Sequence, residues 1–431
     1  MEDASTSAPA QHSVFSRIRR FGTTPEGALF VAFTAWTLAS LDHSLFGYAI
    51  PGAMKEFEIG LDAIGLIVSA SFLFGMVAPV VIGILADSWG PRFLMLACLT
   101  ISSLLVFAQG VANTMFTFGA LRVLSYGISG ALSPVTSAMV ANTAPVERRA
   151  LYIAILQAAF PFGWFLASMA VVPMSQDGDW RAPFSVALLV IPIAVFLYAM
   201  MPKRFPAPTS ATPVDQSPES RVGAAEHPVG SSLSRLFCVE NRRTAILCSL
   251  AFFFYGGAIG GSAFFLPTFF QEDRGYDSST ASMLTGLTYG IAIIGYVGSA
   301  VVSQRLLGAR LTTIIWSAMG SFLLLGTLWV PANLALDIFL FGLTAIFFFG
   351  TSSILTTYVL AVFPPAIRTT AMAVCGTASL TTGFIIFPML ISTAVERIGW
   401  AASFSILIVP ACLMTSVVVS MLPNTDAAAS E

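Results

Sequence analysis

Long apolar runs separated by short polar segments make up most of this chain. Each run is roughly 18–28 residues long, enough to cross a hydrocarbon core about 30 Å thick as a helix. The runs lack the two-residue alternation of a membrane β-strand, and backbone in lipid must be hydrogen-bonded internally. The pattern therefore predicts an all-α membrane protein with twelve transmembrane helices. We expect these at roughly 27–52, 62–86, 93–111, 114–142, 150–174, 180–201, 243–270, 279–303, 311–330, 333–362, 368–394 and 399–422.

The composition supports this prediction and excludes other classes of protein. The 431 residues are 56% hydrophobic and 10% charged, whereas soluble domains carry about 25% charged residues. A net charge of −2 gives no basic field for nucleic acid, so we expect membrane lipid and not nucleic acid as a partner. The sequence contains no nucleophile–base constellation, phosphate loop or metal-ligand spacing among its five cysteines. We therefore expect no enzyme activity, no metal and no cofactor.

The basic residues predict the orientation. With a cytoplasmic N-terminus, fifteen of the 20 Lys and Arg residues lie in cytoplasmic segments and four in outer ones, while Arg122 lies within a span. This asymmetry follows the positive-inside rule, so we expect both termini on the cytoplasmic side of a bacterial inner (plasma) membrane. Residues 1–26 lack the short apolar core and cleavage site of a signal peptide and are expected to form a cytoplasmic tail.

One long polar segment divides the chain into halves. Residues 202–242 begin with a stretch rich in Pro, Ser and Ala that is typical of a flexible cytoplasmic linker. The linker separates a six-span bundle at 27–201 from a second one at 243–422, which is followed by a cytoplasmic tail at 423–431.

The two halves share landmarks at nearly constant spacing. Pro51 at the end of the first span corresponds to Pro267 at the end of the seventh, and Trp180 before the sixth corresponds to Trp400 before the twelfth. Likewise, APVERRA after the fourth span matches PPAIRTT after the tenth. These matches indicate a duplicated six-helix unit, an arrangement that in transporters places the binding site near the midplane between the halves.

The loop between the second and third spans carries a motif. GILADSWGPR contains Gly83, Asp87, Gly90 and Arg92 in the pattern G-x-x-x-D-x-x-G-x-R. Together with twelve spans and a six-plus-six repeat, this loop resembles that of the major facilitator superfamily. The resemblance implies two six-helix bundles that rock about a central site, with these four residues forming a cytoplasmic gate. The corresponding loop of the second half, SQRLLGAR, lacks the aspartate.

The first span suggests a branch of that family. LDHSLFGYAIP supplies Asp42, Gly47 and Pro51, which resembles the aromatic-acid/proton symporters and the anion/cation symporters. Arg122 and the Arg148–Arg149 pair resemble the aromatic-acid branch. The fifth span lacks the Gly-Pro-rich pattern usual in drug/proton antiporters, which counts against an exporter.

Few ionisable groups lie inside the predicted spans. A charge at the centre of a membrane helix costs at least ~2.5–3.5 kcal/mol, so such residues usually face a partner or a water-filled cavity. Asp42 is the candidate to exchange a coupled proton, and His43 is the alternative or accompanying site. Arg122 is expected either to bind a substrate anion or to pair with Asp42. Asp337 lies near the outer start of its span, and we expect it to extend to the membrane interface.

Aromatic and amide side chains near these charges are further candidates. Tyr255 follows a run of phenylalanines and precedes two glycines, where backbone can approach a ligand. We therefore expect an aromatic-lined substrate site. Its candidate lining residues are Phe254, Tyr255, Gln157, Trp164 and Tyr289.

These features together predict a monomeric secondary transporter. The favoured function is proton-coupled uptake of a small organic carboxylate, possibly aromatic, by alternating access. The alternative is a proton-coupled exporter of drugs or metabolites with the same fold. The sequence leaves open which carboxylate is carried and whether sodium replaces the proton.

Overall fold

The computed structural model describes residues 21–145, 148–174, 178–201, 234–364 and 367–423. Most of the predicted linker and tails therefore lies outside the described residues, at 1–20, 202–233 and 424–431. The described part is almost wholly helical. It forms twelve segments that cross the molecule, in agreement with the prediction.

Six segments belong to each half of the chain. Those of the first half are α2 (Pro25–Phe57), α3 (Leu61–Trp89), α4 (Pro91–Gly110), α5 with α6 (Met115–Gly130 and Leu132–Thr143), α7 with α8 (Arg149–Gln157 and Ala159–Met174), and η2 with α9 (Ala182–Leu189 and Val190–Met200). Those of the second half are α12 with α13 (Arg242–Ala263 and Leu266–Glu272), α14 (Ser278–Val302), α15 (Gly308–Leu328), α16 (Leu334–Val362), α17 to α18 (Arg368–Ile398), and α19 to α20 (Trp400–Ser420).

Apolar length alone distinguishes eleven candidate membrane spans among the described residues, because Ser278–Leu328 forms one run of 51 residues. The structure divides this run into α14 and α15. Gly308, with φ of +72°, stands at the division, where a side chain would be strained. With α14 and α15 counted separately, the described residues form twelve segments that cross the molecule.

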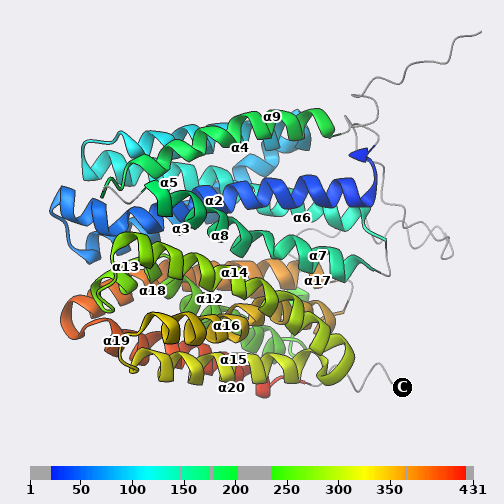
Figure 1. Ribbon diagram of the computed structural model, residues 1–431. Coiled ribbons are helices and arrows are strands. Elements are labelled where there is room, and N and C mark those ends of the chain that lie inside the picture. Colours follow the sequence, from blue (N-terminus) through cyan, green and yellow to red (C-terminus); the bar gives the residue numbers. More distant parts are fainter. Residues whose placement is uncertain (1–20, 146–147, 175–177, 202–233, 365–366, 424–431) are drawn as a thin grey trace, which may run out of the picture.

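The segments pack as two bundles (Figure 1). The first half, blue to green, forms the upper layer of the view, and the second half, green to red, forms the lower layer. The bundles meet mainly where α3 packs on α18 and α8 packs on α14. We call the end where α2 begins and α20 ends the proximal end, and the opposite end the distal end. By the predicted orientation, the distal end faces outside.

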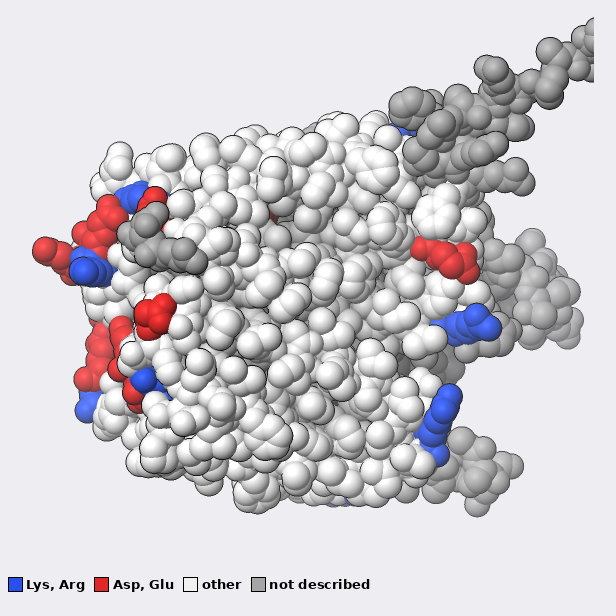
Figure 2. Space-filling view, in the orientation of Figure 1, with Lys and Arg blue, Asp and Glu red and all other residues white. Residues whose placement is uncertain are grey.

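In the view of Figure 2, surface charge gathers at the two ends of the molecule. The broad flank between them is uncharged in this view. This distribution suits a membrane-spanning protein, because the flank meets hydrocarbon and the ends meet water.

Prolines explain three interruptions that the apolar pattern did not reveal. Helices α5, α7 and α12 each end four residues before a proline, at Pro134, Pro161 and Pro267. A proline has no N–H to donate to the carbonyl four residues earlier, and its ring crowds that carbonyl. In the third case the carbonyl is that of Ala263, and it accepts the Tyr289 hydroxyl at 3.3 Å. The predicted spans four, five and seven are therefore discontinuous helices.

The internal repeat appears as the same contact in both bundles. At the distal end, the Trp180 indole donates to Glu56 at 2.8 Å, and the Trp400 indole donates to Glu272 at 2.9 Å. In each half a tryptophan at the start of the sixth segment thus binds a glutamate at the end of the first. The duplicated tryptophans of the sequence therefore occupy equivalent places in the fold.

An arginine also caps the third segment of each bundle at the distal end. Arg181 donates to carbonyls that follow or end α4, and Arg274 does the same for α15. The acceptors are Gly110 and Ala112 in the first half, and Thr327 and Val330 in the second. A cation at a helix C-terminus also interacts favourably with the helix dipole. The two arginines come from non-equivalent loops. Both halves therefore have an arginine cap on the third segment, but its sequence position differs between them.

Close backbone approach joins the bundles in their distal halves. A methyl group added at Gly65 in α3 would lie 2.1 Å from Oγ of Ser392 in α18, and one at Gly286 in α14 would lie 1.7 Å from Oγ of Ser168 in α8. Nearer the distal face, Glu396 accepts from the backbone N–H of Asp62 at 3.0 Å. The bundles are thus closed against each other at the distal end.

Adding a side chain at Gly286 should open this closure. We expect Gly286→Val to collide with Ser168 and to cost about 1–3 kcal/mol, or roughly 5- to 150-fold in the ratio of closed to open molecules. Cysteines at Ser279 and Val172, whose Oγ and carbonyl oxygen lie 3.5 Å apart, would be joined by a short crosslinker. The yield of crosslinked protein should fall in the Gly286→Val variant, because the two cysteines are farther apart in open molecules.

Gly298→Val is the matched control. Gly298 lies on the same helix, and a methyl group there meets nothing within 4 Å. If the two valine variants crosslink equally well, close packing at Gly286 does not hold the distal end closed.

Candidate functional site

Asp42 lies inside the first bundle, on α2. It is 1% exposed, and its Oδ2 accepts the hydroxyl of Ser103 on α4 at 2.8 Å. Its Oδ1 has no hydrogen-bond partner among the described residues. No ion pair joins Asp42 to Arg122 in this structure. The carboxyl group is therefore buried with one neutral donor and no close cation in the described part of the chain.

His43 turns toward α5 on the neighbouring face of α2. Its Nε2 lies 2.5 Å from the hydroxyl oxygen of Ser129, and its ring packs on Tyr126 with centroids 4.3 Å apart. The backbone carbonyl of His43 accepts Nη1 of Arg122 at 3.0 Å. His43 thus connects the segment that carries Asp42 to the arginine on α5.

Arg122 is almost completely buried and only partly satisfied. Its Nη1 bonds to His43, while Nε and Nη2 have no hydrogen-bond partner among the described residues. Nε and Nη2 form one edge of the planar guanidinium, the edge that binds a carboxylate bidentately. An unpaired charged donor in an apolar interior is costly, so this edge has the chemistry of a site for an anion.

Aromatic rings surround that guanidinium. Its Cζ atom lies 4.5 Å from the ring centre of Phe46, 5.0 Å from that of Tyr126 and 5.1 Å from that of Phe264. Phe264 belongs to the second bundle, so Arg122 lies at the interface between bundles. Ring faces stabilise a cation and also offer packing surface for an apolar ligand.

A second ring cluster covers the bundle interface. The rings of Trp164 and Tyr289 stack across it with centroids 4.5 Å apart, and Trp164 lies 5.1 Å from Phe264. On the other side, Phe72 of α3 contacts Phe384 of α18 at 4.7 Å. Of the predicted lining residues, Trp164 and Tyr289 are therefore brought next to the rings around Arg122.

The other predicted lining residues lie elsewhere. Tyr255 points into the second bundle, where its hydroxyl donates to the carbonyls of Phe348 and Phe349 at 3.3 Å. Phe254 packs on Phe253 with centroids 5.3 Å apart, and Gln157 is half-buried at the end of α7. The structure does not bring these three to Arg122.

The motif residues lie at the proximal end. The surroundings of Gly83 and the side chain of Asp87 fall outside the described part of the structure. Gly90 has φ of +80° and begins α4, a conformation that favours glycine. Arg92 donates its Nε to the carbonyl of Tyr198 at 2.7 Å and stacks on that ring. In this state Arg92 is anchored within the first bundle, and the gating role of the motif stays a prediction.

Several residues near Arg122 were not predicted from the sequence. Phe46 and Tyr126 each follow a predicted charged residue by four positions, so helical spacing would have placed them on the same face. Ser103 donates to Asp42, and the Ser129 hydroxyl lies at hydrogen-bond distance from His43. Phe264 comes from the other half of the chain, and no local signal indicated it.

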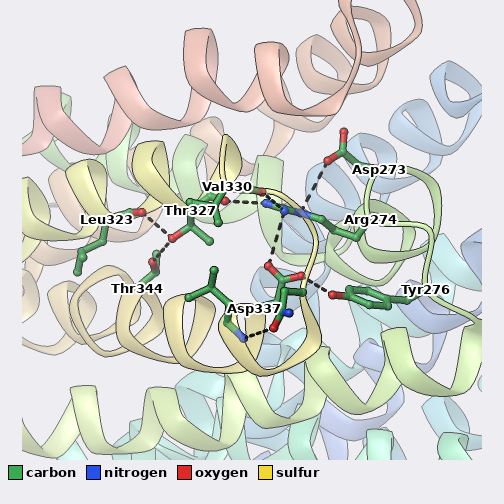
Figure 3. A network of polar contacts seen from close by, with 10 residues as sticks. Asp273, Arg274, Tyr276, Leu323, Thr327, Val330, Asp337 and Thr344 are labelled. Atoms are coloured by element: carbon green, nitrogen blue, oxygen red, sulfur yellow. Dashed lines mark hydrogen bonds and ion pairs between the residues drawn. The ribbon is translucent and has the colours of Figure 1, made fainter.

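Asp337 differs from the expectation. The expectation that its side chain extends to the membrane interface was wrong, because Asp337 is fully buried. Its Oδ2 accepts the Tyr276 hydroxyl at 2.6 Å, and its Oδ1 lies 3.7 Å from Nη1 of Arg274 (Figure 3). Burial and the adjacent carboxylate raise the pKa of Tyr276 to about 12, which keeps it a donor. The loop after α13 is thereby fastened to α15 and α16.

Comparisons with known proteins identify relatives of this architecture. The family model described as Major Facilitator Superfamily matches residues 29–379. The cis,cis-muconate transport protein of Acinetobacter baylyi is 24% identical over 80% of this chain and 82% of its own. The gentisate transporter of Corynebacterium glutamicum is 27% identical over 82% and 77%. The crystal structure of a D-xylose–proton symporter superposes with a TM-score of 0.69 at 18% identity, covering 92% of this chain and 98% of that one.

Removing Arg274 should destabilise the second bundle. Breaking a buried ion pair by removing one partner typically costs about 3–5 kcal/mol, because the other charge stays buried. We therefore expect Arg274→Gln to lower the thermal unfolding temperature clearly in detergent.

Arg397→Gln is the control, because Arg397 is exposed near the same end. Equal unfolding temperatures for the two variants would show that the contacts of Arg274 contribute no more than a surface arginine does.

Proposed function

Because this chain belongs to the Major Facilitator Superfamily, we propose that it takes up a small organic carboxylate together with a proton. The favoured substrate carries an aromatic or similarly flat apolar body. The observation that carries the proposal is Arg122, whose free guanidinium edge lies among three aromatic rings at the bundle interface.

The substrate carboxylate supplies what Arg122 lacks. Two parallel N–H···O bonds from Nε and Nη2 satisfy both free donors and neutralise the buried charge. A neutral substrate would satisfy the donors only in part and would leave the charge. The site therefore favours anions over sugars or cationic drugs.

The surrounding rings provide the apolar part of the site. Phe46, Tyr126 and Phe264 border the guanidinium, and offset or edge-on ring contacts favour an aromatic or conjugated substrate body. The transporters named for muconate and gentisate have substrates of this kind, an unsaturated dicarboxylate and an aromatic acid.

Asp42 is the proposed proton carrier. With a single hydroxyl donor and no cation at ion-pair distance among the described residues, a charged Asp42 is poorly compensated. Binding a proton removes this cost. His43 is the accompanying candidate, since it lies beside Asp42 and holds Arg122 through its carbonyl oxygen.

Alternating access then requires the two bundles to rock about the Arg122 site. In this structure the distal end is closed. Opening it requires a movement that separates α3 from α18 and α8 from α14. We place the protein as a monomer in a bacterial inner membrane with both termini cytoplasmic, so that the distal end faces outside. The motif residues Gly83, Asp87, Gly90 and Arg92 then lie at the cytoplasmic gate.

Uptake into proteoliposomes tests the proposal. With an acidic exterior, radiolabelled gentisate or cis,cis-muconate should accumulate above equilibrium, and dissipating the pH gradient should abolish accumulation. Arg122→Gln should weaken substrate binding by about 2–5 kcal/mol, roughly 30- to 5,000-fold, because a buried charge pair is lost. Asp42→Asn should leave exchange of substrate intact but remove pH-driven accumulation.

Arg397→Gln, an exposed arginine outside the site, should transport normally. Unchanged affinity in Arg122→Gln would remove the carboxylate site, and unchanged accumulation in Asp42→Asn would remove the proton role. Expulsion of substrate driven by an inward proton gradient would instead establish an exporter.

A further inference from the structure

The distal face carries an excess of carboxylates. Its basic side chains among the described residues are Lys55, Arg181, Arg274 and Arg397, and its acidic ones are Glu56, Glu58, Asp62, Asp179, Glu272, Asp273, Asp277 and Glu396. This end lies at the left of Figure 2, where red predominates over blue. Arg181 pairs with Glu56 at 2.6 Å, so that one cation and one carboxylate of this face neutralise each other and the acidic excess remains. An anion that approaches from this side meets a repelling field.

One cleft on this face has the opposite character. It lies between the bundles and encloses about 150 Å³, and Lys55 is the one charged residue among the described residues that line it. Lys55 makes no ion pair within the described ranges. The cleft is therefore a small positive region within an acidic face, and its volume suits a small acid.

The second bundle contributes a polar side chain to the same cleft. Gln271 of α13 lines it opposite α2, and the Gln271 amide nitrogen has no hydrogen-bond acceptor among the described residues. An ammonium from one bundle and an amide donor from the other match the two oxygens of a carboxylate. Ser278 at the start of α14 adds a hydroxyl to the lining.

The cleft lies directly over the layer that closes the Arg122 site. Tyr48 lines it and donates its hydroxyl to the backbone carbonyl of Trp164 at 3.1 Å. The Trp164 ring contacts Phe264, whose ring in turn faces the Arg122 guanidinium. A chain of contacts through Tyr48, Trp164 and Phe264 thus connects the cleft with Arg122.

We propose that this cleft is a capture site for small carboxylates, in which Lys55 holds the anion before the distal contacts open. The identity of the ligand rests on the proposed function, whereas binding in the cleft is a property that can be measured without transport. Lys55 attracts the anion to the cleft although the surrounding face is acidic. Gln271 orients the carboxylate of the anion between the bundles.

Selective acetylation of lysine tests the binding. The chain has two lysines, Lys55 and Lys203, so an N-hydroxysuccinimide ester followed by mass spectrometry reports on Lys55 with Lys203 as internal reference. Benzoate at about twice its dissociation constant should slow acetylation of Lys55 about threefold, in proportion to occupancy. Benzyl alcohol, which has the ring without the charge, should not. The protection should persist in Arg122→Gln and weaken in Gln271→Leu.

Transport kinetics provide the second readout. Lys55→Gln should raise the KM for gentisate uptake several-fold with little change in the maximal rate, and Lys55→Glu should raise it further. The difference in KM between these variants and the wild-type protein should shrink as salt is added, because charges on the surface are screened beyond about 8 Å at 0.15 M ionic strength. Arg397→Gln should leave the KM unchanged.

The two proposals fail differently. If benzoate does not protect Lys55, or if Lys55→Glu and Arg397→Gln have the same KM, the capture site is wrong even where the protein transports gentisate. If wild-type protein transports no carboxylate while benzoate protects Lys55, the capture site stands and the transport function is wrong.

Discussion

The buried guanidinium of Arg122 is the constraint on which the rest of the structure depends. A charge in the middle of a membrane bundle needs compensation, and the chain provides one backbone carbonyl and three ring faces. The carbonyl accepts from Nη1, while Nε and Nη2 have no acceptor among the described residues. A fully paired arginine would be a structural element of one bundle. A partly paired one at the interface of two bundles, next to Phe264 of the second, favours a ligand that both bundles contact.

Discontinuous helices make that interface possible. The break before Pro267 places Phe264 between α12 and α13, so that the second bundle can present this ring to Arg122. The carbonyl freed by the proline is not left unpaired, because it accepts the Tyr289 hydroxyl, and Tyr289 itself stacks on Trp164. One proline thus accounts for the break between α12 and α13, for the acceptor of the Tyr289 hydroxyl and for the position of Phe264 beside the site.

The sequence predicted the spans to within a few residues because apolar length is a direct consequence of bilayer thickness. It did not predict which spans break, since Pro51, Pro173 and Pro388 lie inside continuous helices whereas Pro267 follows a break. Tertiary contacts decide between these outcomes.

Some residues of the candidate site could be predicted from the sequence and others could not. Scarcity of charge singled out Asp42, His43 and Arg122, because each ionisable group in a span is expensive. It could not select the rings, since the chain has 36 phenylalanines and most positions of this type pack in the core or face lipid. Asp337 was misjudged because its partner Arg274 comes from a loop, and pairing across a loop has no signature in helical spacing.

Separation of Asp42 from Arg122 restricts how a proton and a carboxylate can be linked in the proposed cycle. Asp42 and Arg122 form no ion pair in this structure. A substrate carboxylate therefore does not compete directly with Asp42 for Arg122 in this state. Helix α2 connects them instead, because the residue after Asp42 supplies the carbonyl that holds Arg122. Five residues after Asp42, Gly47 brings α2 close to the second bundle, where a methyl group would lie 3.2 Å from the Phe264 carbonyl oxygen. Within six residues, α2 therefore carries the proposed proton site, an anchor of the anion site and a closing contact between the bundles. A small displacement of this one helix on protonation is sufficient to affect all three.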